Sequence, residues 1–301
     1  MKRYLWILLG APAMLAAQSS NGLGTPTLGY LFDAPSGSLQ AIEGVPGAAV
    51  LGETLHLDQA YDAIAVAPSR RYALATRSDS SNLFLVKLDG RSGAATRSGI
   101  ASGRVFFSPS GFAAAIARDG QVEIWTGLPD APALLRTETV EQSIDKAFVS
   151  DNGRELAILS GDSLYRTGEE AALLATQVTD AQFLRGGQDL AALTNAELLL
   201  FRKADKENRE SLMKIEGGRV MAMSRDENSV AVLGEGIVTW FDRTSQASAA
   251  MPVEASLLAR AEGNAVFQLS DENGAVWILD SDTGATRLLK VEAINTERAA
   301  Q

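Results

Sequence analysis

The sequence predicts an all-β protein, a β-propeller of four-stranded antiparallel blades. A pattern of short apolar runs and tight turns recurs about every forty residues, and its clearest copy is residues 106–125, FFSPSGFAAAIARDGQVEIW. Each copy predicts three strands and a weaker fourth, a meander too small to bury both of its own faces, so it needs similar neighbours. Few segments carry a 3.6-residue period over the length of a helix. A ring of repeated blades explains all three observations.

The elements follow from the turn between the first and second strands of each copy. This turn recurs at Pro68, Pro109, Asp151, Arg185, Arg225 and Ala261. First strands are predicted before these anchors, at residues 63–67, 105–107, 147–149, 181–184, 220–223 and 257–259. Second strands, rich in small residues, are predicted at 72–75, 112–117, 156–159, 190–193, 230–233 and 266–269. Bulkier third strands are predicted at 83–86, 122–125, 164–165, 198–201, 237–241 and 276–279.

The beginning of the predicted propeller has its own pattern. Residues 30–42, YLFDAPSGSLQAI, match residues 277–289, WILDSDTGATRLL, in the order apolar strand, Asp, turn with Gly and final strand. The match predicts that the propeller begins with the last two strands of a blade. Residues 48–57 add one more apolar stretch before the first complete repeat. Together with six four-stranded units this favours seven blades, and the alternative is six blades with an N-terminal extension.

The first nineteen residues differ from the rest. Lys2 and Arg3 precede an apolar run at residues 4–17, and small residues follow it. This order predicts a secretory signal peptide, and the run is short for a membrane span. An uncleaved N-terminal anchor is the alternative. We therefore expect a signal peptide at 1–19, a single propeller domain at 20–291 and a polar tail at 292–301.

Composition narrows the classes of function. The net charge is −10 and the chain has no cysteine. A nucleic-acid surface needs a basic stripe, which the sequence does not have. Without cysteine there are no disulfides, no thiolate metal sites and no lipid-modified cysteine. We expect a monomer in the periplasm or secreted, with no membrane insertion after signal cleavage.

The sequence contains few candidates for catalytic or metal-binding residues. His56 is the only histidine, and no nucleophile-elbow pattern lies near it, so we expect an exposed imidazole at a strand end. The run DSDTG at 280–284 looks like part of a calcium loop but lacks the distal glutamate, and a hairpin turn needs the same residue types. The run DENG at 271–274 is interpreted in the same way. We therefore predict no catalytic residue, no metal and no cofactor.

Two segments carry a family resemblance. FSPSGFAAAIARDGQVEIW and MSRDENSVAVLGEGIVTWFD resemble WD-repeat strands, and they also resemble the looser repeats of exported bacterial propellers of the Tol system and the YVTN type. The resemblance covers about residues 25–291 and implies the fold only. Gly-His pairs are absent, and residues 240–242, Trp-Phe-Asp, are the nearest form of Trp-Asp. The Asp-His network of WD-repeat blades is therefore not expected.

A candidate binding rim is predicted on the face where the first strands begin. Loops that enter the first strands and loops that join the second and third strands share this face of a propeller. Its candidate residues are Asp62, Arg104, Asp145, Lys146, Asp180, Arg219, Arg77, Asp79, Arg118 and Asp119. Mixed signs around one rim indicate mutual ion pairing more often than a ligand clamp.

Three functions fit these observations. The favoured one is a non-catalytic scaffold that binds a protein partner in the cell envelope. The alternatives are a binder of a small ligand or ion at the channel mouth, and a carbohydrate-active hydrolase or lyase that uses rim carboxylates. Spacing along the chain does not show which carboxylates converge, so the enzyme stays open.

Overall fold

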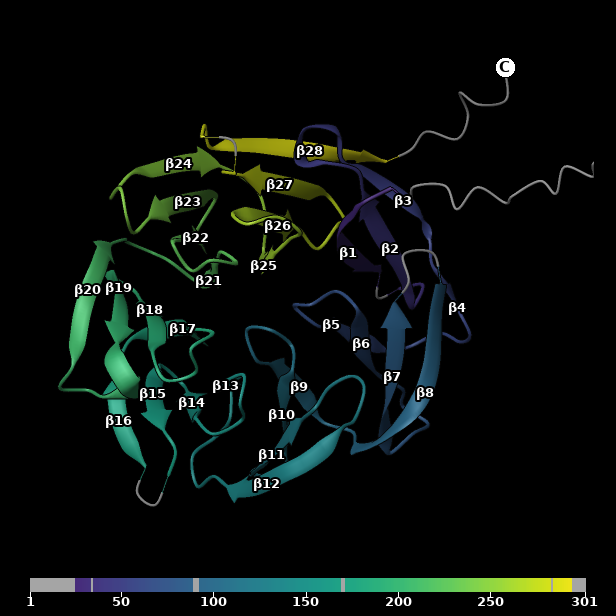
Figure 1. Ribbon diagram of the computed structural model, residues 1–301, viewed down its shortest axis with the longest axis horizontal. Coiled ribbons are helices and arrows are strands. Elements are labelled where there is room, and N and C mark those ends of the chain that lie inside the picture. Colours follow the sequence, from purple (N-terminus) through teal and green to yellow (C-terminus); the bar gives the residue numbers. More distant parts are fainter. Residues whose placement is uncertain (1–24, 34, 89–91, 169–170, 283, 294–301) are drawn as a thin grey trace, which may run out of the picture.

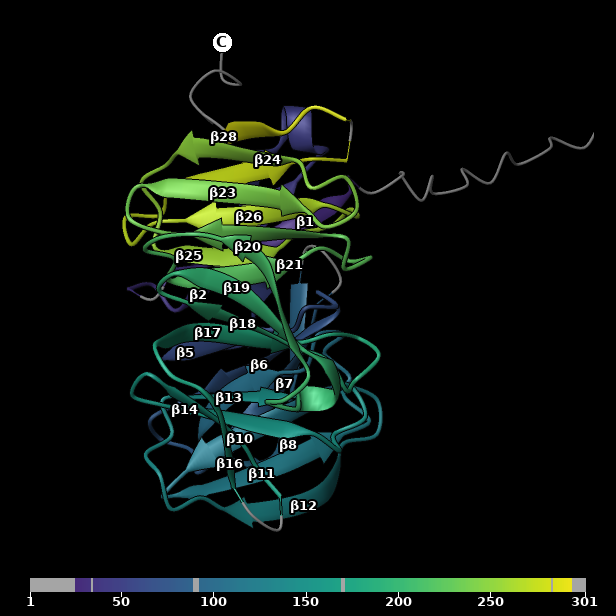
Figure 2. The ribbon, with the colours of Figure 1, turned by 90° about the vertical axis from the view of Figure 1, so that its left-hand side faces the viewer.

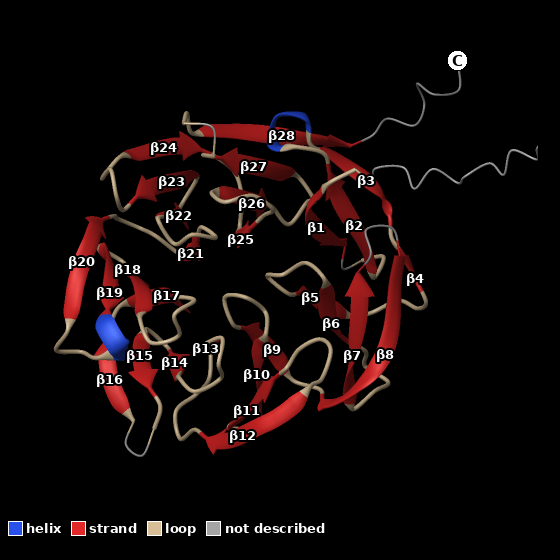
Figure 3. Cartoon of the chain, viewed as in Figure 1, coloured by secondary structure: helices blue, strands red, loops and turns tan. Residues whose placement is uncertain are grey.

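The computed structural model describes residues 25–33, 35–88, 92–168, 171–282 and 284–293. These residues form strands arranged as blades around a central channel, with two short 3-10 turns, η1 (Pro46–Ala48) and η2 (Arg202–Ala204) (Figures 1 and 3). In the side view of Figure 2 the strands run across the thickness of the ring. The predicted signal peptide lies outside the described residues, as does all of the predicted tail beyond residue 293.

Six units of the ring are four-stranded antiparallel meanders, ordered from the channel outwards as in the sequence. Their innermost strands are β5 (Ala63–Val66), β9 (Arg104–Phe107), β13 (Lys146–Val149), β17 (Val178–Phe183), β21 (Val220–Met223) and β25 (Leu257–Arg260). The second strands are β6 (Tyr72–Thr76), β10 (Ala113–Arg118), β14 (Leu156–Ser160), β18 (Leu190–Thr194), β22 (Ser229–Leu233) and β26 (Val266–Ser270).

The outer half of each unit completes the blade. The third strands are β7 (Asn82–Leu88), β11 (Gln121–Thr126), β15 (Ser163–Arg166), β19 (Glu197–Phe201), β23 (Ile237–Asp242) and β27 (Val276–Asp280). The fourth strands are β8 (Ser92–Ala101), β12 (Ala133–Thr139), β16 (Ala172–Ala175), β20 (Arg209–Lys214), β24 (Ser248–Pro252) and β28 (Arg287–Ala293). Every predicted strand run overlaps its observed strand, so the predicted fold class is confirmed.

Local chemistry explains these strands. Between β10 and β11 the two-residue turn of Asp119 and Gly120 has positive φ at both positions, 49° and 74°, the geometry of the tightest antiparallel hairpins. The turn from β9 to β10 ends at Gly111, φ 73°, where an added Cβ would lie 3.2 Å from that of Ala67 in the preceding blade. Small alanines fill β10 and are fully buried. Neighbouring blades can therefore approach closely.

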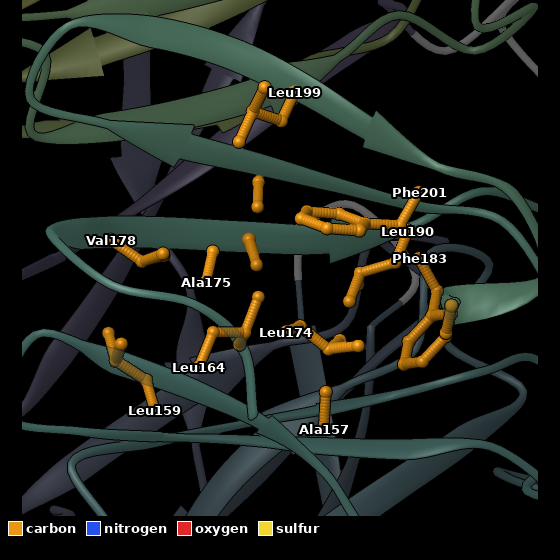
Figure 4. Packing of buried hydrophobic residues seen from close by; sticks show 13 residues of the cluster. Ala157, Leu159, Leu164, Leu174, Ala175, Val178, Phe183, Leu190, Leu199 and Phe201 are labelled. Atoms are coloured by element: carbon orange, nitrogen blue, oxygen red, sulfur yellow. The ribbon is translucent and has the colours of Figure 1, made fainter. Parts of the chain in front are cut away.

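The core lies between blades rather than within one centre. A representative cluster joins the blade of β13–β16 to that of β17–β20 and includes Leu164, Phe183, Leu190 and Phe201 (Figure 4). Similar clusters lie between the other neighbouring blades. Each blade thus depends on its neighbours for burial of its faces.

The first unit departs from the prediction. It has three strands, β1 (Thr27–Asp33), β2 (Ser38–Glu43) and β3 (Val50–Thr54), with β1 innermost and β3 outermost. The match of residues 30–42 to the last two strands of a blade is therefore wrong. The 3-10 turn η1 reverses the chain after β2, and β3 pairs with the outer edge of β2.

The direction of β1 shows which strand this unit lacks. The start of β1 lies beside the end of β25, since Glu262 N–H donates to Leu28 O at 2.8 Å. The β1–β2 turn lies beside the residues that precede β5, since Gly37 approaches Tyr61. The strand β1 therefore runs opposite to β25 and β5, as a second strand does. This unit holds the equivalents of strands two to four and has no innermost strand among the described residues.

The ring closes at this unit through parallel pairs. Two residue pairs join β3 to β28, and β4 (His56–Leu57) continues beside β8. The single histidine, His56, is exposed in β4, as expected for a strand-end imidazole. A count of seven blades, with this unit as the incomplete one, stays a prediction.

Candidate functional site

We call the face where the innermost strands begin the upper face, and the face where they end the lower face. The predicted rim lies on the upper face, and its residues bond to their neighbours. Lys146 Nζ is 2.9 Å from Asp180 Oδ1, and Asp180 Oδ2 accepts the main-chain N–H of Met221 at 2.9 Å. This chain of contacts links three successive blades.

The other rim residues are also engaged. Arg104 donates to the main-chain oxygens of Ile144 and Asp145 in the next blade, and the Asp145 carboxylate accepts the N–H of Gly161 at 2.6 Å. Other contacts of the predicted rim include Arg77 with Asp79, Asp62 with the N–H of Ser78, Arg219 with Glu235, and Arg118 with Glu123. Asp119 forms a hairpin turn. Of the ten rim residues, Lys146 and Asp180 line the central channel.

Asp180 is the most perturbed acid of this rim. Its residue is 7% exposed, and burial raises the pKa of its carboxyl above the usual range, although Lys146 and the N–H of Met221 favour the charged form. The folded protein therefore holds this proton more tightly than the unfolded chain. Stability contributed by protonated Asp180 is present at low pH and is lost as pH rises from about the unfolded pKa, near 3.8, through the folded pKa.

The raised pKa of Asp180 gives a prediction for Asp180→Asn, a variant whose side chain has the same shape but does not titrate. We expect the free energy of unfolding of the wild type, relative to that of the variant, to fall as pH rises through this window. Lys146→Met should move the window to higher pH, because Lys146 lowers the pKa of Asp180. Urea unfolding across the acidic range measures both effects. A pH-independent difference between wild type and Asp180→Asn would contradict the assignment.

A large opening lies beside the rim, where the first unit has no innermost strand among the described residues. It is a cavity of about 1260 Å³ between β1, β25 and β5, larger than the range of about 300–1,000 Å³ common for ligand pockets. Its wall is largely apolar: Leu31, Phe32, Ile64, Val66, Leu257 and Leu258. Figure 1 shows β1, β25 and β5, three of the strands that line this cavity, on the side of their units that faces the ring centre.

The mouth of the cavity is acidic. Asp33, Asp271 and Glu272 line it at the upper face, and its described lining includes no lysine, arginine or histidine. Asp271 accepts the N–H groups of Asn273 and Ala275, so it shapes the β26–β27 loop as a turn residue. Glu272 is exposed. A ligand that enters from this face therefore meets negative charge before it meets the apolar wall.

The sequence did not point to this cavity, because no motif marks a missing strand. Nor did it single out the arginines near the lower end of the channel, although two of its turn anchors, Arg185 and Arg225, are among them. In the acidic run at 280–284, the Asp280 carboxylate accepts the N–H of Asp282 at 3.1 Å and lies 2.9 Å from Arg287. Asp282 accepts the N–H groups of Asn264 and Ala265.

The described residues contain no group of three or more His, Asp or Glu side chains placed to hold a metal ion. Within the same part of the chain, no helix has the length and apolar character needed to cross a membrane.

No family model matches the sequence, and no curated protein matches it. Solved structures do resemble the fold. A functionally unknown protein from Desulfotomaculum acetoxidans aligns with a TM-score of 0.61 over 89% of this chain and 100% of that one, at 11% identity. A protein from Lactobacillus plantarum gives 0.59 over 88% and 96%, at 11% identity. Kuenenia stuttgartiensis hydrazine synthase gives 0.56 over 87% and 92%, also at 11%. These likenesses show the fold alone.

Proposed function

We propose that the protein is an exported, non-catalytic propeller that binds a protein partner by accepting an extended segment beside β1. Within this proposal it belongs with the exported propellers of the Tol and YVTN types, whose repeats it resembles. Export rests on the N-terminal pattern of Lys2, Arg3 and the apolar run after them. The observation that carries the binding function is the edge of β1 that pairs with no described strand and lies along the cavity of about 1260 Å³.

The edge of β1 has the chemistry to pair with a strand. On one side β1 pairs with β2, and on the other no strand of the described residues pairs with it. On that second side Leu28 O accepts the N–H of Glu262 and Tyr30 O accepts Gln268 Nε2 at 2.9 Å, so a strand bound there would displace the Gln268 side chain. Leu39 O accepts the N–H of Leu55, so Leu39 faces β3, and Phe32 opposite it belongs to a pair without hydrogen bonds. The N–H and C=O of Phe32 therefore point toward the cavity. An extended segment that pairs there adds a strand to the sheet.

The protein's own innermost strands indicate what fits this position. They have four to six residues, start at the upper face and run antiparallel to the second strand. Two of them begin with a basic residue and continue with apolar ones, β9 (RVFF) and β13 (KAFV). A partner segment in the same direction has its N-terminal end at the acidic mouth. The proposed occupant is an extended segment with a basic residue followed by three or more apolar residues.

The rim supports binding rather than catalysis. Asp62, Asp145 and Asp180 each accept a main-chain N–H group, so these carboxylates stabilise loops and blade contacts. A glycoside hydrolase needs two carboxyl groups free to face one sugar bond.

A defined probe tests the proposal. The fluorescent peptide Gly-Ser-Lys-Ala-Phe-Val-Ser-Gly copies β13, and its binding is followed by fluorescence anisotropy. We expect saturable binding that weakens at least tenfold when alternate amides of the peptide are N-methylated, because methylation removes the donors of strand pairing. Replacement of its Lys by Glu should weaken binding several-fold at low salt, because the mouth is acidic.

Leu257→Lys and Ile237→Lys form a matched pair of variants. Both residues are exposed aliphatic side chains at the start of a strand, 62% and 47% exposed, but only Leu257 lines the cavity. Leu257→Lys should abolish peptide binding, and Ile237→Lys should retain it. Equal binding by the N-methylated peptide, or by both variants, would overturn the proposal. A dimer of the free protein that Leu257→Lys dissociates would assign the edge to a second copy instead.

A further inference from the structure

Four arginines meet at the lower end of the channel, opposite the rim. Arg70, Arg185 and Arg225 lie in turns that follow innermost strands, and Arg260 is the last residue of β25. Arg260 Nη2 donates to Pro109 O at 3.0 Å, a contact with a blade that is not its neighbour in the ring. Arg70 Nη1 donates to Arg260 O, and Arg185 Nη1 donates to Arg225 O, both at 3.4 Å. These contacts bring the four side chains to one mouth.

The carboxylates nearby neutralise only part of this charge. Glu262 pairs with both Arg70 and Arg225, the latter at 3.1 Å. Glu227 accepts the main-chain N–H of Arg185, not its guanidinium. In the described part of the chain, no carboxylate lies within ion-pair distance of the Arg185 or Arg260 guanidinium.

Arg260 is in an unusual position for a cation. Burial, together with the charges of Arg185, Arg70 and Arg225, lowers its pKa to about 10, whereas Asp151 acts in the opposite direction. A guanidinium has five N–H donors, and Pro109 O takes one from Arg260. The local field at this mouth is therefore positive, although the protein as a whole carries a net charge of −10.

We propose that the lower mouth binds an oxyanion, a phosphate or carboxylate group, between Arg260 and Arg185, with Arg70 and Arg225 around it. Guanidinium groups bind such anions through paired N–H···O bonds, which are stronger than bonds between neutral groups. The anion also relieves the repulsion among the arginines. The channel above it, about 680 Å³ and mostly apolar, admits an apolar group attached to the anion. None of the four arginines lines the cavity beside β1, although that cavity and the channel share wall residues such as Leu257 and Gln268.

Inorganic phosphate is the first probe, and acetate is the second, each compared with chloride at equal ionic strength. Isothermal titration calorimetry measures affinity, and the 15N signals of the arginine Nε groups locate the site. We expect saturable phosphate binding with a dissociation constant in the millimolar range or tighter. Acetate binding as well would indicate that any carboxylate is accepted, and phosphate alone would indicate a dianion.

Four variants make the test specific. Arg260→Gln and Arg185→Gln should each weaken phosphate binding at least tenfold, and the exposed Arg185 tests the site even if Arg260→Gln fails to fold. Glu262→Gln should strengthen binding several-fold, because it frees Arg70 and Arg225 from a competing carboxylate. Arg219→Gln, on the upper face, should leave it unchanged. Equal phosphate binding by Arg260→Gln, Arg185→Gln and wild type would overturn the proposal, as would a chloride effect of the same size.

Discussion

A chain that begins at Gln59, without β1 to β4, is expected to aggregate. The removed unit contributes six buried apolar residues, Leu28, Tyr30, Leu39, Ala41, Ile42 and Leu55. At about 1.5–3 kcal/mol for each large side chain, the loss is on the order of 10 kcal/mol. Domains of this kind have a total stability of about 5–15 kcal/mol. The truncation also uncovers the β28 edge and the apolar flanks of β5 and β25, which recruit other chains.

Size-exclusion chromatography and thermal unfolding measure this effect. The control is a chain that begins at Thr25, which keeps every residue of the first unit. A Gln59 chain that stays monomeric with an unchanged melting temperature would show that β1 to β4 are an appendage rather than part of the ring.

The second large effect is expected for Phe201→Ala. Phe201 is fully buried and packs in the cluster between two blades, with Phe183, Leu190 and Leu164 around it (Figure 4). Truncation of such a side chain costs about 3–5 kcal/mol, because it loses burial and leaves a cavity.

Phe112→Ala is the matched control, since Phe112 is 54% exposed in the turn between β9 and β10, and its loss should change stability by no more than about 0.5 kcal/mol. Urea unfolding gives both values. A cost for Phe201→Ala no larger than that for Phe112→Ala would show that the blade interface does not stabilise the ring.

The strands could be predicted from sequence because their signals are local. An apolar run such as AAAIAR in β10 and the Asp-Gly turn after it specify a hairpin without reference to the rest of the chain. The position of a hairpin relative to the channel, in contrast, depends on contacts between residues far apart in the sequence. Residues 30–42 have the strand-turn-strand pattern of β27 and β28, yet β2 has a further strand outside it, set by the distant pairing of Leu39 with Leu55.

The residues of the rim and of the lower mouth were also predictable only in part. Mixed charges at the start of the first strands predicted mutual pairing, and Lys146 with Asp180 is one such pair, but which partners pair depends on how the ring closes. For the lower mouth, the sequence did contain a signal for two of the arginines. Arg185 and Arg225 stand forty residues apart at the same turn of successive repeats, so a ring must bring them together. Arg260 lacked this signal because it precedes its turn anchor, Ala261, by one residue.

The ring is closed at β3 and β28 by pairing between strands from the two ends of the described chain. At this junction two residue pairs, Glu292 with Val50 and Ala293 with Leu51, join the strands in parallel, and a buried cluster that includes Leu28 and Ile278 packs between the two units. A parallel pairing of only two residue pairs contributes little stability, and it involves the same unit that lacks an innermost strand among the described residues. A strand bound beside β1 would add contacts to the unit where the ring closes. Binding of the partner segment would then also stabilise the closed ring against opening at β3 and β28.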